Sequence, residues 1–296
     1  MYLFILFVSF ISMSGFGLRC SRPETDNRYV LFHDFQCTTV IELFSSGAQR
    51  AADSLGVLVS VAAESTITTK QVDSLTTSAA GIGVSSTMQS PFVERLLKRT
   101  RKKEIELLCI NGRHPLLPDA PAIDSFFYTA GAAAGRFIVQ RFGESGRFAI
   151  MTSMFDRRES NESIRGFRDN LLTPQYRWTQ VNIITCQQNP HAFEYYKRMS
   201  RFGNRTIWFW ADSCEHLVDE IERIKKDNYF IAIKLDVDPC KISKENNALM
   251  DAIVLKDYQH MGYLAVCELV NPKPMQDIDD PPNIDCGCRI KQSTTN

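Results

Sequence analysis

Hydrophobic and polar positions follow two alternating patterns along this chain. Short apolar runs, such as residues 29–32 and 206–210, have the length of buried strands. Between such runs lie stretches in which apolar residues recur every three or four positions, the spacing of a helix that buries one face. Repeated alternation of strands and helices predicts parallel sheets with helices on both faces.

The expected elements extend over most of the chain. We expect strands at residues 29–32, 57–61, 81–85, 105–110, 148–151, 181–185, 206–210, 230–235 and 252–255. We expect helices at residues 40–55, 68–75, 91–102, 128–142, 216–226 and 259–269, and one that carries Ile164, Phe167 and Leu171. A chain of 296 residues can form one large core or two medium ones. This number of strands favours two doubly wound α/β lobes.

The stretch from Tyr128 to Leu172 is the most informative. Small residues at 130–135 allow a helix to lie close against a sheet, and a short apolar run and a second helix follow. In open α/β sheets, ligands bind at the carboxyl ends of strands. The polar residues from Asp156 to Asn161 stand at such an end, although for most of them a solvated loop is the favoured interpretation.

The order of these pieces resembles a known family. The sequence A-A-G-R at 133–136, a strand, and N-x-x-x-R-G-F at 161–167 are similar to the ribose-binding-type, type I periplasmic binding proteins. The apolar strand at 230–236 and the segment K-D-Y-Q-H-M-G-Y at 256–263 match two further segments of that family. The resemblance covers about residues 28–270. It implies two lobes joined by a multi-strand hinge.

The resemblance also implies a division of the chain. Lobe 1 would comprise residues 27–125 plus the helix 257–270, and lobe 2 would comprise residues 126–256, with crossings near Ser125, Lys256 and Val270. Residues 271–296 contain several prolines and an acidic patch, which is typical of an extended tail.

Eight ligand-contacting positions follow from the resemblance. They are Asp34, Thr38, Asn111, Arg113, Asn161, Phe193, Asp236 and Lys256. The resemblance implies that Asn111 and Arg113 grip sugar hydroxyls, that Phe193 stacks on the sugar ring and that Asp236 keeps a family carboxylate. Lys256 replaces a family Gln.

Some family groups are replaced in this chain. Val40 and Ile41 stand where the family has two aromatic residues, so an ordinary pentose or hexose is in doubt as the ligand. Two cations, Lys256 and Arg113, beside Asp236 would suit an anionic or strongly polar ligand, such as a sugar acid or a polyol derivative.

The amino-terminal segment and the cysteines give opposing indications of location. Residues 2–13 are apolar and uncharged, and Gly15 and Gly17 follow, which is typical of a signal peptide at 1–19 and of a periplasmic or exported protein. Anchoring in the membrane through this segment, or lipidation of Cys20, stays open. Against export, the nine cysteines are scattered and form no C-x-x-C pair, as in proteins with free thiols.

Composition and missing motifs narrow the function. The chain has 34 Lys and Arg residues and 34 Asp and Glu residues, so it has no excess of positive charge. Composition therefore gives no indication of nucleic-acid binding. The chain has no G-x-S-x-G or H-E-x-x-H, no G-x-G-x-x-G after the first strand, and no histidine spacing typical of a metal site. We therefore expect no enzyme activity, no cofactor and no metal.

Two hypotheses remain. The first is a solute-binding protein that captures a sugar or sugar-like polar molecule between its lobes for an ABC-type transporter or receptor in the membrane. The alternative is a degenerate sensory or regulatory module of the same fold, which acts mainly through protein contacts. The missing family aromatics favour the alternative.

Overall fold

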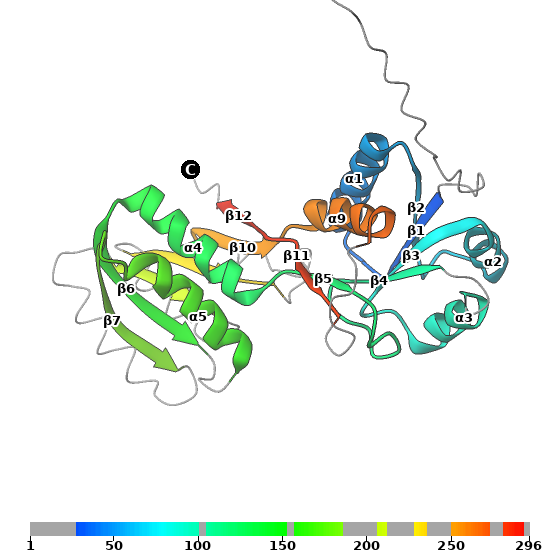
Figure 1. The fold of residues 1–296 in the computed structure, drawn as a ribbon. Helices are drawn as coiled ribbons and strands as arrows, with labels where there is room; N and C mark the ends of the chain where they lie inside the picture. Colours follow the sequence, from blue (N-terminus) through cyan, green and yellow to red (C-terminus); the bar gives the residue numbers. More distant parts are fainter. Residues whose placement is uncertain are drawn as a thin grey trace, which may run out of the picture.

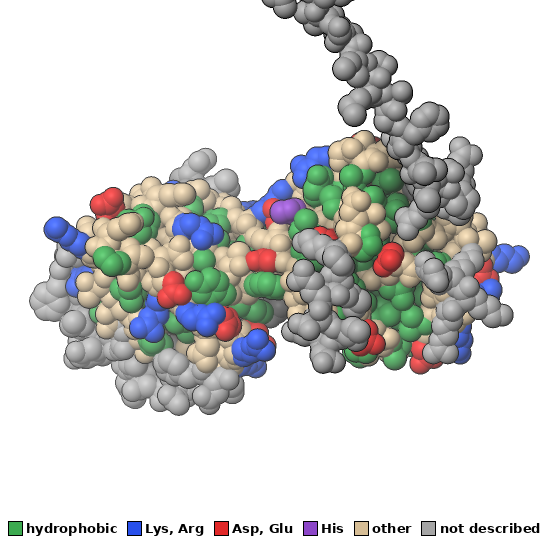
Figure 2. Space-filling model, in the orientation of Figure 1, with side chains coloured by type: hydrophobic (Ala, Val, Ile, Leu, Met, Phe, Trp, Pro, Cys, Tyr) green, Lys and Arg blue, Asp and Glu red, His purple; other side chains and the backbone are tan. Residues whose placement is uncertain are grey.

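The computed structural model describes residues 28–100, 105–152, 157–185, 206–211, 228–235, 250–272 and 281–292. These residues form two six-stranded sheets, one in each of two lobes (Figure 1). A space-filling view shows the lobes as two bodies joined by a narrow waist (Figure 2). No helix among the described residues is long and apolar enough to cross a membrane.

The sheet of lobe 1 is parallel throughout. Its strands, in spatial order, are β11 (Asn283–Asp285), β5 (Ala122–Asp124), β4 (Glu106–Ile110), β3 (Ala79–Ser85), β1 (Arg28–His33) and β2 (Leu58–Ala63). Helices α1 (Thr38–Leu55) and α9 (Tyr258–Val270) cover one face, and α2 (Thr69–Ser78) and α3 (Ser90–Thr100) cover the other (Figure 1). Both faces are therefore buried, which explains why β1 is an almost continuous apolar run.

The sheet of lobe 2 is parallel except at one edge. Its strands, in spatial order, are β12 (Cys288–Gln292), β10 (Ala252–Lys256), β9 (Tyr229–Ile233), β8 (Thr206–Trp210), β6 (Ser145–Thr152) and β7 (Arg177–Thr185). Strand β12 is antiparallel to β10. Helices α4 (Phe127–Phe142) and α5 (Arg158–Leu171) pack on one face through Ile138, Phe167 and Leu171. The two-lobed α/β architecture confirms the fold class expected from the sequence.

The carboxyl-terminal residues belong to both sheets. The sequence analysis treated 271–296 as an extended tail, whereas β11 pairs with β5 in lobe 1 and β12 pairs with β10 in lobe 2. Part-buried Ile284 packs in the core of lobe 1, and Cys288 and Ile290 pack in that of lobe 2. The chain crosses between the lobes after β5, after β10 and again at residues 286–287, so the third crossing is not near Val270.

Two glycines set the spacing between α4 and α5. A Cβ on Gly131 would lie 1.9 Å from the Ser163 carbonyl oxygen, and a Cβ on Gly166 would lie 2.0 Å from the Tyr128 carbonyl oxygen. Each helix thus rests its backbone on a glycine of the other. The same reciprocal contact joins α1 to α9 through Gly47 and Gly262. Small residues in the sequence therefore mark where helices touch.

We predict that Gly166→Ala destabilises lobe 2. The added methyl group must displace backbone atoms, and such overpacking typically costs about 1–3 kcal/mol. Urea unfolding of the variant and of Gln140→Ala, an exposed control on α4, should show this loss in the first protein alone. Equal stability of the two variants would show that α4 and α5 can move apart to accept the methyl group without a loss of unfolding free energy.

Candidate functional site

A pocket lies between the two lobes at the carboxyl ends of their strands. Its volume is about 440 Å³, which is in the usual range for small-molecule sites of about 300–1,000 Å³. The residues that line it are Asp34, Phe35, Gln36, Cys37, Val40, Thr87, Asn111, Asp124, Leu235, Lys256 and Tyr258. Leu235 follows β9 and Lys256 ends β10, whereas most of the others follow strands of lobe 1. Parallel strands bring these ends to one edge of each sheet, where open α/β folds bind ligands.

Lys256 joins the two lobes inside this pocket. Its ammonium group donates hydrogen bonds to Asn111 Oδ1 at 2.8 Å and to Asp124 Oδ1 at 2.7 Å, and both acceptors belong to lobe 1. Lys256 is only 8% exposed. A buried ammonium needs a charged partner and hydrogen-bond acceptors, and these two residues supply both. Because a lysine ammonium has three protons, one donor is left for a ligand.

The turn after β4 aims Asn111 at this ammonium. Asn111 has a φ of 61° and Gly112 a φ of 103°, so both adopt conformations that L side chains rarely take. Asn is among the residues that tolerate the left-handed region, and Gly does so without strain. The Ser86 hydroxyl donates to the Asn111 carbonyl oxygen at 2.6 Å and holds the turn. The Asn-Gly pair therefore orients a carboxamide into the pocket.

Asp34 is held from one side only. Its Oδ1 accepts hydrogen bonds from the hydroxyl group of Ser85, the last residue of β3, at 2.8 Å and from that of Thr87, two residues later, at 2.7 Å. Within the described part of the chain, no hydrogen bond reaches its Oδ2. The carboxylate is thus oriented by the protein and keeps one oxygen for a ligand.

Aromatic side chains form one wall of the pocket. Phe35 stacks on His33, with ring centroids 5.1 Å apart, and meets the Tyr258 ring edge-on at 5.6 Å. A second edge contact, at 5.4 Å, joins Phe35 to buried Phe44. Phe35 and Tyr258 come from the first loop and from α9, so they supply aromatic surface although Val40 and Ile41 stand at the expected aromatic positions.

His33 supports this wall as a neutral imidazole. The side chain is buried, and its Nδ1 accepts a hydrogen bond from the Phe35 amide at 3.2 Å. Burial lowers the pKa of His33 below its ordinary 6.5, and the nearby Asp34 carboxylate opposes this shift only in part. A neutral ring is needed, because a protonated Nδ1 cannot accept the amide proton.

The chain matches a known family over most of its length. A family model described as a periplasmic binding protein domain matches residues 29–271. The chain belongs to this family. The comparison with curated proteins finds no match. Periplasmic binding proteins bind solutes and catalyse no reaction, so the prediction that the chain is not an enzyme is confirmed. Membership also indicates an exported, extracytoplasmic protein.

Three solved structures share this fold. A mutant XylFII–LytSN complex has a TM-score of 0.64 and 18% identity, with 91% of this chain and 99% of that chain covered. The arabinose-binding protein AraP from Geobacillus stearothermophilus has a TM-score of 0.55 and 17% identity, with 90% and 97% covered. A sugar-binding protein of a sugar ABC transporter from Bacillus halodurans has a TM-score of 0.54 and 14% identity, with 91% and 98% covered. Identities this low establish the fold alone.

The pocket of this periplasmic binding protein brings together three of the residues expected from sequence. Asp34, Asn111 and Lys256 line it, whereas Thr38 is exposed at the start of α1 and Asn161 is exposed on α5. Phe193 and Asp236 lie outside the described residues. The ligand contacts expected of Thr38 and Asn161 stay predictions.

Arg113 has partners of its own outside the pocket. Its guanidinium donates to the carbonyl oxygens of Pro118 and Pro281, both at 2.8 Å, and to Asn283 Oδ1 at 3.1 Å. These contacts fasten β11 to lobe 1, and Arg113 is not among the residues that line the pocket. A ligand contact by Arg113 would require at least some of these bonds to be exchanged.

Sequence reasoning missed Asp124, Thr87, Phe35 and Tyr258. Asp124 ends the three-residue strand β5, which is too short to give an apolar run. Phe35 stands two residues beyond the end of β1. The rule that ligands bind at the carboxyl ends of strands could have identified it as a pocket residue. The aromatic at Tyr258 was visible in the segment 256–263 but matched a family position with no assigned ligand contact.

The cysteines fit an exported protein better than their scattered spacing indicates. Cys37, at the N-cap of α1 and in the pocket wall, is disulfide-bonded, which favours an oxidising compartment. Cys109, Cys267, Cys286 and Cys288 are free. Burial raises the pKa of the Cys286 and Cys288 thiols to about 12, so both stay protonated and unreactive.

We predict that His33 makes the stability of lobe 1 sensitive to acid. The pKa of His33 is lower in the folded than in the unfolded chain, so below about pH 6.5 the unfolded chain binds more protons and stability falls. Melting temperatures measured from pH 7.5 to 5.5 should fall less steeply for His33→Gln than for the unchanged protein. The exposed-histidine control His260→Gln should keep the original slope. The same slope in His33→Gln would contradict this role.

Proposed function

We propose that this periplasmic binding protein captures a neutral sugar or sugar-like polyol between its lobes and presents it to a membrane permease or receptor. The observation that carries the proposal is the pocket at the strand ends, to which both lobes contribute polar groups. Two solved structures with this fold support it, since one is an arabinose-binding protein and the other is a complex of XylFII with LytSN.

The chemistry of the pocket suits a polyhydroxylated ring. Sugar recognition combines hydrogen-bonding groups with aromatic surface for the apolar faces of the ring. Asp34 Oδ2 offers an acceptor and the third Lys256 proton a donor, while Phe35 and Tyr258 offer ring faces or edges. A hydroxyl group can both donate and accept, so it can satisfy both polar groups at once.

The charges favour a neutral ligand over an anionic one. The charged residues among those described in the pocket lining are Asp34, Asp124 and Lys256. Lys256 is paired with Asp124, and the Arg113 guanidinium is directed to main-chain carbonyls instead. The anionic ligand inferred from the sequence rested on two free cations. With Lys256 neutralised by its partner, a ligand carboxylate would meet the unpaired charge of Asp34.

Capture would proceed by closure of the lobes. A ligand that contacts Asp34 in lobe 1 and also the strand end of lobe 2 at Leu235, away from the Lys256 contact, stabilises the closed arrangement, because the open arrangement lacks one set of contacts. We infer that the protein acts in the periplasm after removal of residues 1–19, because the apolar segment 2–13 is typical of a signal peptide. The mass of the native protein would exclude this if it included Met1.

A thermal-shift panel tests the proposal. We expect neutral pentoses, hexoses or polyols to raise the melting temperature, since a ligand at a hundred times its dissociation constant stabilises by about 2.7 kcal/mol. For the best neutral sugar, the matching sugar acid should bind at least about tenfold more weakly in calorimetry at pH 7.5. Tighter binding of the acid would overturn the assignment of a neutral ligand. The alternative function, a module that acts mainly through protein contacts, predicts no stabilisation by any sugar.

Asp34 provides a second, local test. Asp34→Asn keeps the shape but removes a charged acceptor, and a hydrogen bond to a charged group contributes about 1.5–3 kcal/mol. Affinity for the best neutral sugar should therefore fall about ten- to a hundredfold. Asp119→Asn, at an exposed position outside the pocket, is the matched control and should bind as the unchanged protein does. Equal affinities of the two variants would remove Asp34 from the site.

A further inference from the structure

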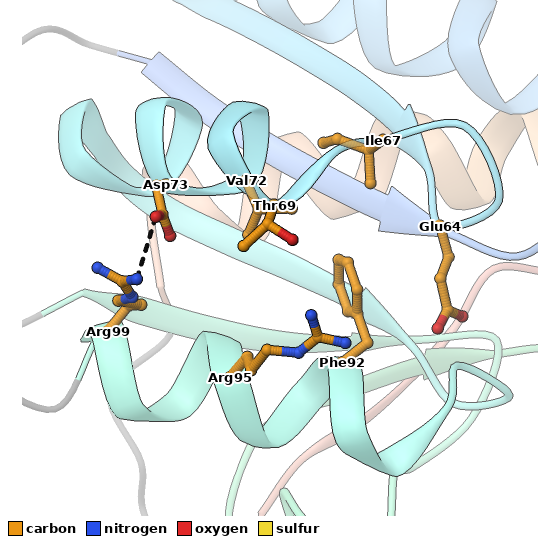
Figure 3. A pocket seen from close by; sticks show the side chains of 8 residues that line it. All are labelled: Glu64, Ile67, Thr69, Val72, Asp73, Phe92, Arg95 and Arg99. Atoms are coloured by element: carbon orange, nitrogen blue, oxygen red, sulfur yellow. Dashed lines mark hydrogen bonds and ion pairs between the residues drawn. The ribbon is translucent and has the colours of Figure 1, made fainter.

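A second pocket lies on lobe 1 between α2 and α3 and shares no lining residue with the ligand pocket. Thr69, Val72 and Asp73 face it from α2, and Phe92, Arg95 and Arg99 face it from α3 (Figure 3). On α3 the residues are three, four and seven positions apart, and on α2 Val72 and Asp73 stand three and four positions after Thr69, so each set lies on one side of its helix. Its volume is about 180 Å³, well below the usual range for enclosed small-molecule sites, about 300–1,000 Å³. The pocket has room for a side chain rather than for a sugar.

Both ends of this pocket are closed by internal contacts. At one end Arg99 pairs with Asp73 at 3.0 Å. At the other end Glu64 Oε2 accepts a hydrogen bond from the Gln89 amide at 3.3 Å, just before α3 begins. The apolar floor between these ends consists of Ile67, Val72 and Phe92.

Arg95 lies between the two closed ends with much of its hydrogen-bonding capacity unused. Its Nε donates to the Pro91 carbonyl oxygen of the same helix at 3.1 Å, which holds the side chain along α3 (Figure 3). Within the described part of the chain, its two terminal amino groups have no hydrogen-bond or ion-pair partner. The guanidinium is therefore already oriented and still able to bind a carboxylate through two parallel bonds.

We propose that this pocket is a docking site for a partner protein that inserts an Asp or Glu beside an apolar side chain. The carboxylate pairs with Arg95 and the apolar side chain covers the floor of the pocket. Charge supports this occupant. Arg99 is paired with Asp73, so Arg95 is the lining cation that has no carboxylate partner among the described residues. Lys98 lies three positions from Arg95 on α3 and adds a second positive charge. Local positive charge attracts acidic partners and speeds their encounter.

The loop before α3 connects this docking site to the ligand pocket. The Gln89 amide binds Glu64 at the end of the docking site, and Thr87, two residues earlier, binds Asp34 in the ligand pocket. A partner that displaces Glu64 thus acts on the loop that orients the ligand-binding carboxylate. The docking site itself does not depend on the proposed sugar.

Nuclear magnetic resonance of the full chain tests the site with a defined probe. The probe is a set of acetylated peptide amides in which one Glu or Asp stands one to four positions from one Leu or Phe. We expect at least one peptide to shift the Arg95 side-chain signal saturably, and its Gln or Asn version to bind at least tenfold more weakly. If no peptide shifts this signal, or if the acidic peptide and its Gln or Asn version bind equally, the proposal of a docking site is wrong.

Two variants separate specific docking from general charge attraction. Arg95→Gln should abolish binding of the acidic peptide, whereas Lys98→Gln, the same change in charge on the same helix but outside the pocket lining, should keep it. Equal loss in both variants would show attraction by net charge alone. Binding of anionic lipid vesicles that requires Arg95, without peptide binding, would replace the protein partner by a membrane. The rise in melting temperature that a sugar causes should be the same in both variants as in the unchanged protein. A failure of the docking proposal is therefore distinct from a failure of the sugar proposal.

Discussion

The buried ammonium of Lys256 is the interaction on which the arrangement of this protein depends. It comes from the last residue of β10 in lobe 2, and its hydrogen-bond partners among the described residues are Asn111 and Asp124 in lobe 1. An uncompensated buried charge costs about 3–5 kcal/mol, so separating these residues is unfavourable unless water replaces the partners. The contact lies beside two chain crossings, at Ser125 and Asp257, where small changes of backbone angle move whole lobes. Lys256 thus fixes the pivot and at the same time lines the pocket.

The ligand pocket follows from this pivot and from sheet geometry. Parallel strands bring the loops after β1, β3, β4 and β5 to one edge of lobe 1, and β9 and β10 end opposite them. Each loop then adds a specific device: hydroxyl groups that orient Asp34, a left-handed turn that aims Asn111, and a neutral His33 that supports Phe35. These devices are held by hydrogen bonds and ring contacts within lobe 1, so binding needs little further ordering of that lobe.

Hydrophobic periodicity and the order of family segments predicted much of the fold and part of the pocket. They did not predict contacts between residues that are distant in sequence. Apolar runs and helical spacing identified most described elements, and family order placed Asp34, Asn111 and Lys256 in the site. The sequence could not show that Lys256 is paired, because its partners stand 132 and 145 positions away in sequence. Strands β5 and β11 have three residues each, too few for a periodic signal, so Asp124 and the pairing of the carboxyl-terminal residues went unrecognised. The local pattern of apolar and polar residues indicates which positions are buried. The partners of ions and strands depend on which distant residues the fold brings together.

The central claim is that one ligand bridges two lobes that move about the Lys256 contact. Small-angle X-ray scattering tests it most directly, with the protein measured alone and with a neutral sugar whose binding calorimetry has established. The account predicts a smaller radius of gyration with the sugar bound, because closure brings the lobes together. An unchanged radius of gyration at saturating sugar would contradict the account and would place the ligand within one lobe or in an already closed cleft.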